Sequence, residues 1–139
     1  MSWKWFALGS AFFAGLTAIF GKLGVEGLNS NLATLIRTII IAAMTVCIVT
    51  YRGEWQLPRS VSARPIAFLV LSGIATGLSW LLYYRALQLA PASQVAPIDK
   101  LSVAFAVILG VVFLGEEPTI RLAAGVLLIV SGVLVLAWP

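Results

Sequence analysis

Long apolar stretches separated by short polar segments dominate the chain. A transmembrane helix needs about 20 predominantly apolar residues. Five stretches meet that requirement: residues 3–22, 32–51, 65–85, 95–114 and 119–138. Segments rich in glycine, proline and charge, such as RGEWQLPRSVSAR and GEEP, separate them. The pattern predicts an all-α membrane protein, a single bundle of five transmembrane helices with no soluble domain.

Composition supports this class and excludes others. Hydrophobic residues make up 61% of the 139 residues and charged residues only 10%, whereas soluble domains carry about 25% charged residues. The net charge of +4 includes no basic run interleaved with aromatic residues, so we expect no nucleic-acid partner. Histidine is absent and no carboxylate pair has a base beside it, so we expect no enzyme, no catalytic residue, no metal and no cofactor.

The distribution of basic residues predicts the orientation of the chain in the membrane. Loop ends on the two sides of the predicted spans carry five basic residues against two, and cytoplasmic loops carry the excess of Lys and Arg. We therefore expect a multi-pass protein of the cytoplasmic (inner) membrane with a cytoplasmic N-terminus and a retained first helix. The five residues are Lys4, Arg52, Arg59, Arg64 and Arg121, and the two are Lys22 and Arg85.

Three charged residues fall inside the predicted spans. The apolar part of the fourth span, residues 101–114, is about 21 Å long as a helix, and the hydrocarbon core is about 30 Å thick. Asp99 and Lys100 must therefore lie at hydrocarbon depth, and Arg37 lies near the start of the second span. Such residues usually face the bundle interior and pair with one another.

Helical geometry suggests how these charges are used. Adjacent residues point about 100° apart on a helix, so we expect Asp99 and Lys100 not to pair, and we propose Asp99 with Arg37 instead. The face of Asp99 carries small or polar residues such as Ser102. Asp99 either forms an ion pair that sets helix register or handles substrate or protons directly. Lys100 either faces the interior as well or extends its ammonium group to the nearby membrane interface.

Proline and glycine mark the remaining candidate features. Pro97, with the nearby Pro91, argues against a continuous helix, and a helix that starts near Pro97 would have Asp99 in its first turn, where the dipole favours an acid. Irregular backbone at membrane depth is tolerated where it lines a cavity. Gly125 and Gly132 of the last span serve either packing within the chain or a dimer interface.

Two aromatic residues of the third span, Trp80 and Tyr84, lie four positions apart on one helical face, together with two glycines. They form either the wall of a pocket or part of an interfacial aromatic belt.

The segment YRALQLAPASQVAPIDKLSVAFAVILGVVFLGEEPT (residues 84–119) resembles the second half of an EamA domain, from the drug/metabolite transporter superfamily. TAIFGKLG (residues 17–24) and Arg37 fit the first half, so the resemblance covers essentially the whole chain. It implies a secondary transporter with two five-span halves in inverted orientation, of which this chain supplies one. An antiparallel homodimer, or a heterodimer with a similar half-size protein, would complete it.

The fifth span, GVLLIVSGV (residues 125–133), is also similar to the dimerisation helix of small multidrug resistance transporters. Those relatives carry a glutamate inside their first helix, and this chain has no acid there. If an acid does that work here, Asp99 is the candidate.

These observations favour a transporter that exports small organic metabolites by alternating access. The net positive charge of the pathway favours substrates with a carboxylate or phosphate. The alternative is a non-transporting membrane subunit that packs on a partner through Gly125 and Gly132, for example in lipid-carrier flipping. The expected pathway residues are Lys22, Arg37, Trp80, Tyr84, Asp99, Lys100 and Ser102.

Overall fold

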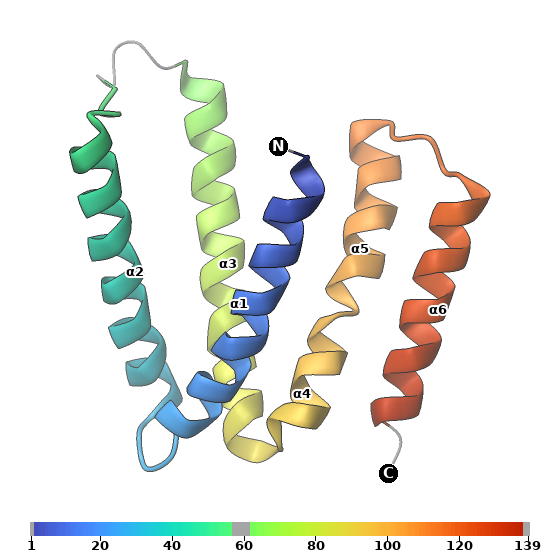
Figure 1. Cartoon of the computed structure of the whole chain (residues 1–139), viewed down its shortest axis with the longest axis horizontal. Helices are drawn as coiled ribbons and strands as arrows, with labels where there is room; N and C mark the ends of the chain where they lie inside the picture. Colours follow the sequence, from blue (N-terminus) through green and yellow to red (C-terminus); the bar gives the residue numbers. More distant parts are fainter. Residues whose placement is uncertain (1, 57–61, 138–139) are drawn as a thin grey trace. The chain divides into compact units, whose positions relative to one another are not determined.

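The computed structural model of the chain describes residues 2–56 and 62–137, and these residues form helices and connecting turns with no strand (Figure 1). Five helical segments within the described residues are long and apolar enough to cross a membrane. The all-α, five-span prediction is therefore confirmed. The elements are α1 (Trp3–Gly24), α2 (Ser30–Arg52), α3 (Ala63–Leu89), α4 (Ala92–Asp99), α5 (Ser102–Leu109), η2 (Gly110–Leu114, a π-helical turn) and α6 (Ile120–Ala137).

Local signals in the sequence explain where several helices end. The Asn29 side chain caps α2 by accepting a 2.9 Å hydrogen bond from the Asn31 amide. Gly53 follows α2 with a φ of 64° and Gly115 follows η2 with a φ of 69°. This left-handed conformation closes helices and is readily adopted only by glycine.

The third helix is longer than the apolar pattern predicts. It was expected over residues 65–85 and extends over Ala63–Leu89, so Arg85 lies one turn before its end. A helix can continue past a polar residue near its end, because a long side chain such as that of Arg85 extends its charged group toward the membrane interface. Arg59, which is one of the basic residues behind the predicted orientation, lies outside the described residues. So does Trp138, the last residue of the predicted fifth span.

The chain divides into two compact units. One unit comprises Gly21–Leu89 and contains the end of α1, α2 and α3. In this unit α2 and α3 pack side by side and run in opposite directions (Figure 1). Its buried residues include Leu87, which is 0% exposed, together with Val25, Ala33 and Tyr84.

The other unit comprises the described parts of residues 1–20 and 90–139. Here α6 packs against both α4 and α5, and Val95 of α4 and Val133 of α6 are buried. Figure 1 shows the interruption that separates α4 from α5 within the fourth span. The backbone amides of Lys100 and Leu101 bond to carbonyls three residues back, at 2.9 Å and 3.0 Å, instead of four.

This interruption changes the expected surroundings of Asp99. The helix starts at Ala92 rather than near Pro97, so Pro97 lies inside α4 and Asp99 is its last residue, not part of a first turn. Pro97 is the sixth of the eight residues of α4. Because proline lacks an N–H, the bond to the carbonyl of Ser93 is lost, and the helix ends two residues later. Asp99 therefore lies at the end of α4, directly before the break that precedes α5.

Most apolar side chains of the spans face outward. In the most apolar window of each span, between 0% and 11% of the residues are buried inside the protein. Phe13 and Leu82, for example, are 66% and 73% exposed. Such a surface requires lipid or other protein around it.

Candidate functional site

Arg37 lies well inside α2. It is the eighth residue of that helix, about 10 Å along the axis from the first. The hydroxyl groups of Thr34 and Thr38 donate to backbone carbonyls one turn back, at 2.9 Å and 2.8 Å, so these polar residues are satisfied within the helix. The contacts of the Arg37 side chain, by contrast, lie on another element of the unit.

Those contacts are with an aromatic pair on α3. The guanidinium carbon of Arg37 lies 4.0 Å from the centre of the Trp80 ring and 5.5 Å from the centre of the Tyr84 ring. Trp80 and Tyr84 are one helical turn apart, so both rings face α2. A cation over an aromatic face is attracted by the ring quadrupole. The structure thus brings together three of the residues that the sequence singled out.

The end of α1 supports this arrangement. Tyr84 is 5% exposed, and a Cβ atom added to Gly21 would lie 3.4 Å from its hydroxyl oxygen and 3.2 Å from Cδ1 of Leu87. The absence of a side chain at Gly21 lets α1 approach α3 at this point. By contrast, a Cβ at Gly73 or Gly77, the glycines on the predicted α3 face, would meet nothing within 4 Å.

Lys22 binds the end of α3. Its ammonium donates a 2.6 Å hydrogen bond to the carbonyl oxygen of Leu87. The last carbonyls of a helix lack partners within the helix and carry the negative end of its dipole, so a lysine there stabilises the helix. The structure thus gives Lys22 a helix-capping contact, and its place in a substrate pathway stays a prediction.

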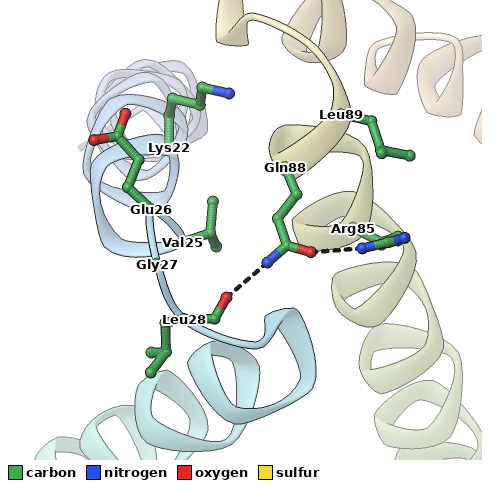
Figure 2. A pocket seen from close by; sticks show the side chains of 8 residues that line it. All are labelled: Lys22, Val25, Glu26, Gly27, Leu28, Arg85, Gln88 and Leu89. Carbon is green, nitrogen blue, oxygen red and sulfur yellow. Dashed lines mark hydrogen bonds between the residues drawn. The ribbon is translucent and has the colours of Figure 1, made fainter.

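An open pocket of about 520 Å³ lies between the end of α1, the following turn and the last two turns of α3 (Figure 2). Gln88 bridges it, donating to the carbonyl of Leu28 at 2.7 Å and accepting from Arg85 at 2.9 Å. Sequence reasoning missed Gln88. Its signal was the spacing of four that continues from Trp80 and Tyr84 along the same face of α3.

The second unit contains the charged residues of the fourth span. The Lys100 ammonium lies 3.3 Å from Oδ2 of Asp99, so the expectation that the two do not pair is wrong. The interruption is the reason, since the angular argument applies only to a regular helix. Both side chains remain substantially exposed, at 53% and 37%, so the pair contributes little stability. Ser102 is the exposed first residue of α5.

A mostly apolar groove of about 410 Å³ lies between α4 and α6, with Pro97, Lys100 and Gly132 among its lining residues. A Cβ atom at Gly125 or at Gly132 would meet nothing within 4 Å. Neither glycine is therefore required for a close contact within the described part of the chain.

The predicted pathway residues fall into the two units. Lys22, Arg37, Trp80 and Tyr84 belong to one, and Asp99, Lys100 and Ser102 to the other. The pairing of Asp99 with Arg37 joins different units and stays a prediction. Across residues 2–56 and 62–137, no group of three or more Asp, Glu, Cys or His side chains could hold a metal ion.

Comparison with known proteins assigns the chain to a family. A transporter of Sinorhizobium sp, named "Uncharacterized transporter in cobO 3'region", is 51% identical over 136 residues, covering 98% of this chain and 96% of that protein. The probable 4-amino-4-deoxy-L-arabinose-phosphoundecaprenol flippase subunit ArnE of Yersinia pseudotuberculosis is 26% identical over 112 residues, covering 80% of this chain and 98% of the subunit.

A longer human protein, solute carrier family 35 member G1, is 28% identical over 125 residues, covering 90% of this chain but 34% of that protein. No solved structure matches the chain. The model of the EamA-like transporter family matches residues 1–138. The match spans nearly the whole chain and confirms the resemblance seen in the sequence: the protein belongs to the EamA-like transporter family.

Proposed function

We propose that the protein is a half-size secondary transporter that exports small organic metabolites across the cytoplasmic membrane by alternating access. The observation that carries the proposal is the position of Arg37, about 10 Å inside a span and with its guanidinium carbon 4.0 Å from the centre of the Trp80 ring. Ionisable residues inside membrane spans usually belong to the path of a substrate or ion. Membership of a transporter family supports the same conclusion.

An energy comparison shows how the protein tolerates Arg37 inside a span. Placing an arginine at the centre of a membrane helix costs about 2.5–3.5 kcal/mol on insertion scales. A cation–π contact returns about 0.5–2 kcal/mol, depending on how far the cation is desolvated. The two rings together thus return about 1–4 kcal/mol, which is comparable to the cost. The aromatic contacts therefore make a charged residue tolerable at this depth, where its charge can act on a ligand.

The interruption of the fourth span gives independent support. Charged side chains and a break in the helix occur together at Asp99 and Lys100. Transporters place broken helices at their midplane sites, where irregular backbone faces a cavity. We place both residues in the same pathway as Arg37, with Asp99 as the proton-handling or pairing group.

A dimer would provide the second half of the pathway. The human relative is about three times as long as the matched segment, which fits a fold that needs more than one such unit. A Cβ atom at Gly125 or Gly132 of α6 would meet no described residue within 4 Å, so both positions are available to a second copy or to a similar half-size protein. The bias of basic residues favours one orientation, with a cytoplasmic N-terminus. A heterodimer with an inverted half-size protein agrees with this bias, whereas an antiparallel homodimer requires half of the chains to insert the other way.

Two experiments test this assembly and activity. A reporter fused to the C-terminus should give signal from both sides of the membrane if two copies assemble antiparallel, and signal from one side alone would exclude an antiparallel homodimer. Purified protein in liposomes should take up at least one solute from a panel of labelled carboxylates, phosphate esters, amines and neutral metabolites. If no solute and no proton moves under any imposed gradient, the transport proposal fails.

A non-transporting subunit is the second candidate. It is favoured by the relative named as a flippase subunit, which the chain matches over 98% of that subunit's length. In this case α6 would pack on a different membrane protein through Gly125 and Gly132. Purification of this protein from its native membranes should then recover a larger partner protein at fixed stoichiometry. Substituting leucine for both Gly125 and Gly132 should release that partner.

A further inference from the structure

The N–H groups of the Arg37 guanidinium have no acceptor within its own unit. A guanidinium is planar and has five N–H donors around its edge. Its central carbon lies 4.0 Å from the centre of the Trp80 ring, and within Gly21–Leu89 it forms no ion pair and donates no hydrogen bond to a described residue. Every buried side-chain nitrogen or oxygen among the described residues has a hydrogen-bond partner. Since the Arg37 nitrogen atoms have no such partner, they are accessible to a ligand.

The aromatic contacts also orient the N–H groups of Arg37. The Trp80 and Tyr84 rings restrict the rotation of the guanidinium, and the buried Tyr84 is held in turn by the close approach of α1 at Gly21. Two parallel N–H groups of a fixed guanidinium match the two oxygens of a carboxylate or phosphate. The surrounding apolar span has a low dielectric, which strengthens such a pair.

We propose that the ligand bound at Arg37 is an organic anion, a carboxylate or a phosphate monoester, held by the guanidinium edge while Trp80 supports its face. This inference rests on the proposed transport function and names its substrate class. The positive charge of Arg37 is thereby neutralised by the substrate itself. The same geometry disfavours protonated amines, because the Arg37 cation repels them. It also disfavours neutral amides, because they lack a negative charge to pair with the guanidinium.

The experiment compares four ligands that share a benzene ring and differ in one group: benzoate, phenyl phosphate, benzamide and benzylamine. Binding to the full chain in lipid nanodiscs is measured by calorimetry. We expect benzoate or phenyl phosphate to bind about tenfold to a hundredfold more tightly than benzamide, the range for a charge-assisted pair. Benzylamine should bind most weakly.

Variants connect the preference to the guanidinium. R37Q should remove the preference for anions, and R37K should keep part of it, because lysine retains the charge but loses the two-pronged contact. R52Q is the matched control. It removes one charge from the same helix, where Arg52 is exposed and paired with Glu54 at 2.7 Å, and it should leave the preference unchanged.

The proposal is overturned if benzoate and benzamide bind wild-type protein equally, if none of the four probes binds, or if folded R37Q keeps the anion preference. The wild-type comparison stands even where a variant does not fold. Uptake of the same probes into liposomes separates this proposal from the transport function. Selective anion binding without uptake of any solute would contradict transport alone, whereas uptake that prefers benzylamine would contradict the anion site alone.

Discussion

Gly21 offers a test of how closely α1 must approach α3. A Cβ atom at this position would lie 3.2 Å from Cδ1 of Leu87 and 3.4 Å from the hydroxyl oxygen of Tyr84. The first distance is shorter than ordinary van der Waals contact, and the second is at its lower limit. Leu87 is 0% exposed, so its side chain has no free space into which to move. The substitution G21A should therefore crowd the packed core of this unit.

The expected magnitude follows from two opposing effects. Replacing glycine by alanine inside a helix stabilises it by about 1 kcal/mol. Crowding a packed core costs about 1–3 kcal/mol. The net change for G21A should thus lie between no effect and a loss of about 2 kcal/mol, and G21V should be worse because its two further methyl groups enter the same space.

Gly15 is the matched control on the same helix. A Cβ atom there would meet nothing within 4 Å, so G15A should show only the gain in helix stability, about 1 kcal/mol. Unfolding of each variant is measured by titration with a denaturing detergent and followed by circular dichroism. We expect G21A to be less stable than G15A by about 1–3 kcal/mol. Equal stabilisation of the two variants would refute the close approach.

Three further predictions use other contacts. Q88A should lower the free energy of unfolding by about 1–3 kcal/mol through the loss of two hydrogen bonds, measured against the exposed control Q94A, and equal effects would argue against the bridge. G115A should lower the free energy of unfolding by about 1–2 kcal/mol, because residue 115 has a left-handed backbone that alanine adopts at a cost. G115N should recover part of this loss. W80L should weaken benzoate binding about twofold to thirtyfold by releasing Arg37, while W80F should weaken it less.

The sequence could predict the spans because lipid imposes a simple rule. A chain must satisfy its backbone hydrogen bonds within the membrane, and helices of about 20 apolar residues do so. The predicted stretches therefore agree with the observed helices except near their ends and at the interruption of the fourth span. The α3 helix continues past Arg85 to Leu89, because tertiary contacts of Leu87 and Gln88 stabilise a turn whose composition alone does not require it.

The site shows where pattern reasoning fails. The sequence indicated that Arg37 lies at membrane depth and that Trp80 and Tyr84 share a face, since both follow from helical spacing. It could not show that the two faces meet, because spacing along one helix carries no information about its rotation toward another. The expectation for Asp99 and Lys100 is wrong for a related reason. The prolines indicate an irregular backbone before Pro97, but the break lies after Asp99, where a regular helix was assumed, and it lets the two residues pair.

The amino-acid sequence by itself determined that this protein is a five-span membrane protein, which residues place charge within the spans, and the resemblance to a transporter family. These properties depend on composition and on distance along the chain, and lipid enforces both. Only the tertiary structure decided that Arg37 lies over Trp80, that Gln88 joins α3 to the turn after α1, and that Gly21 rather than Gly73 is the point of close approach. These contacts depend on how helices turn and pack against one another, which is a cooperative property of the fold.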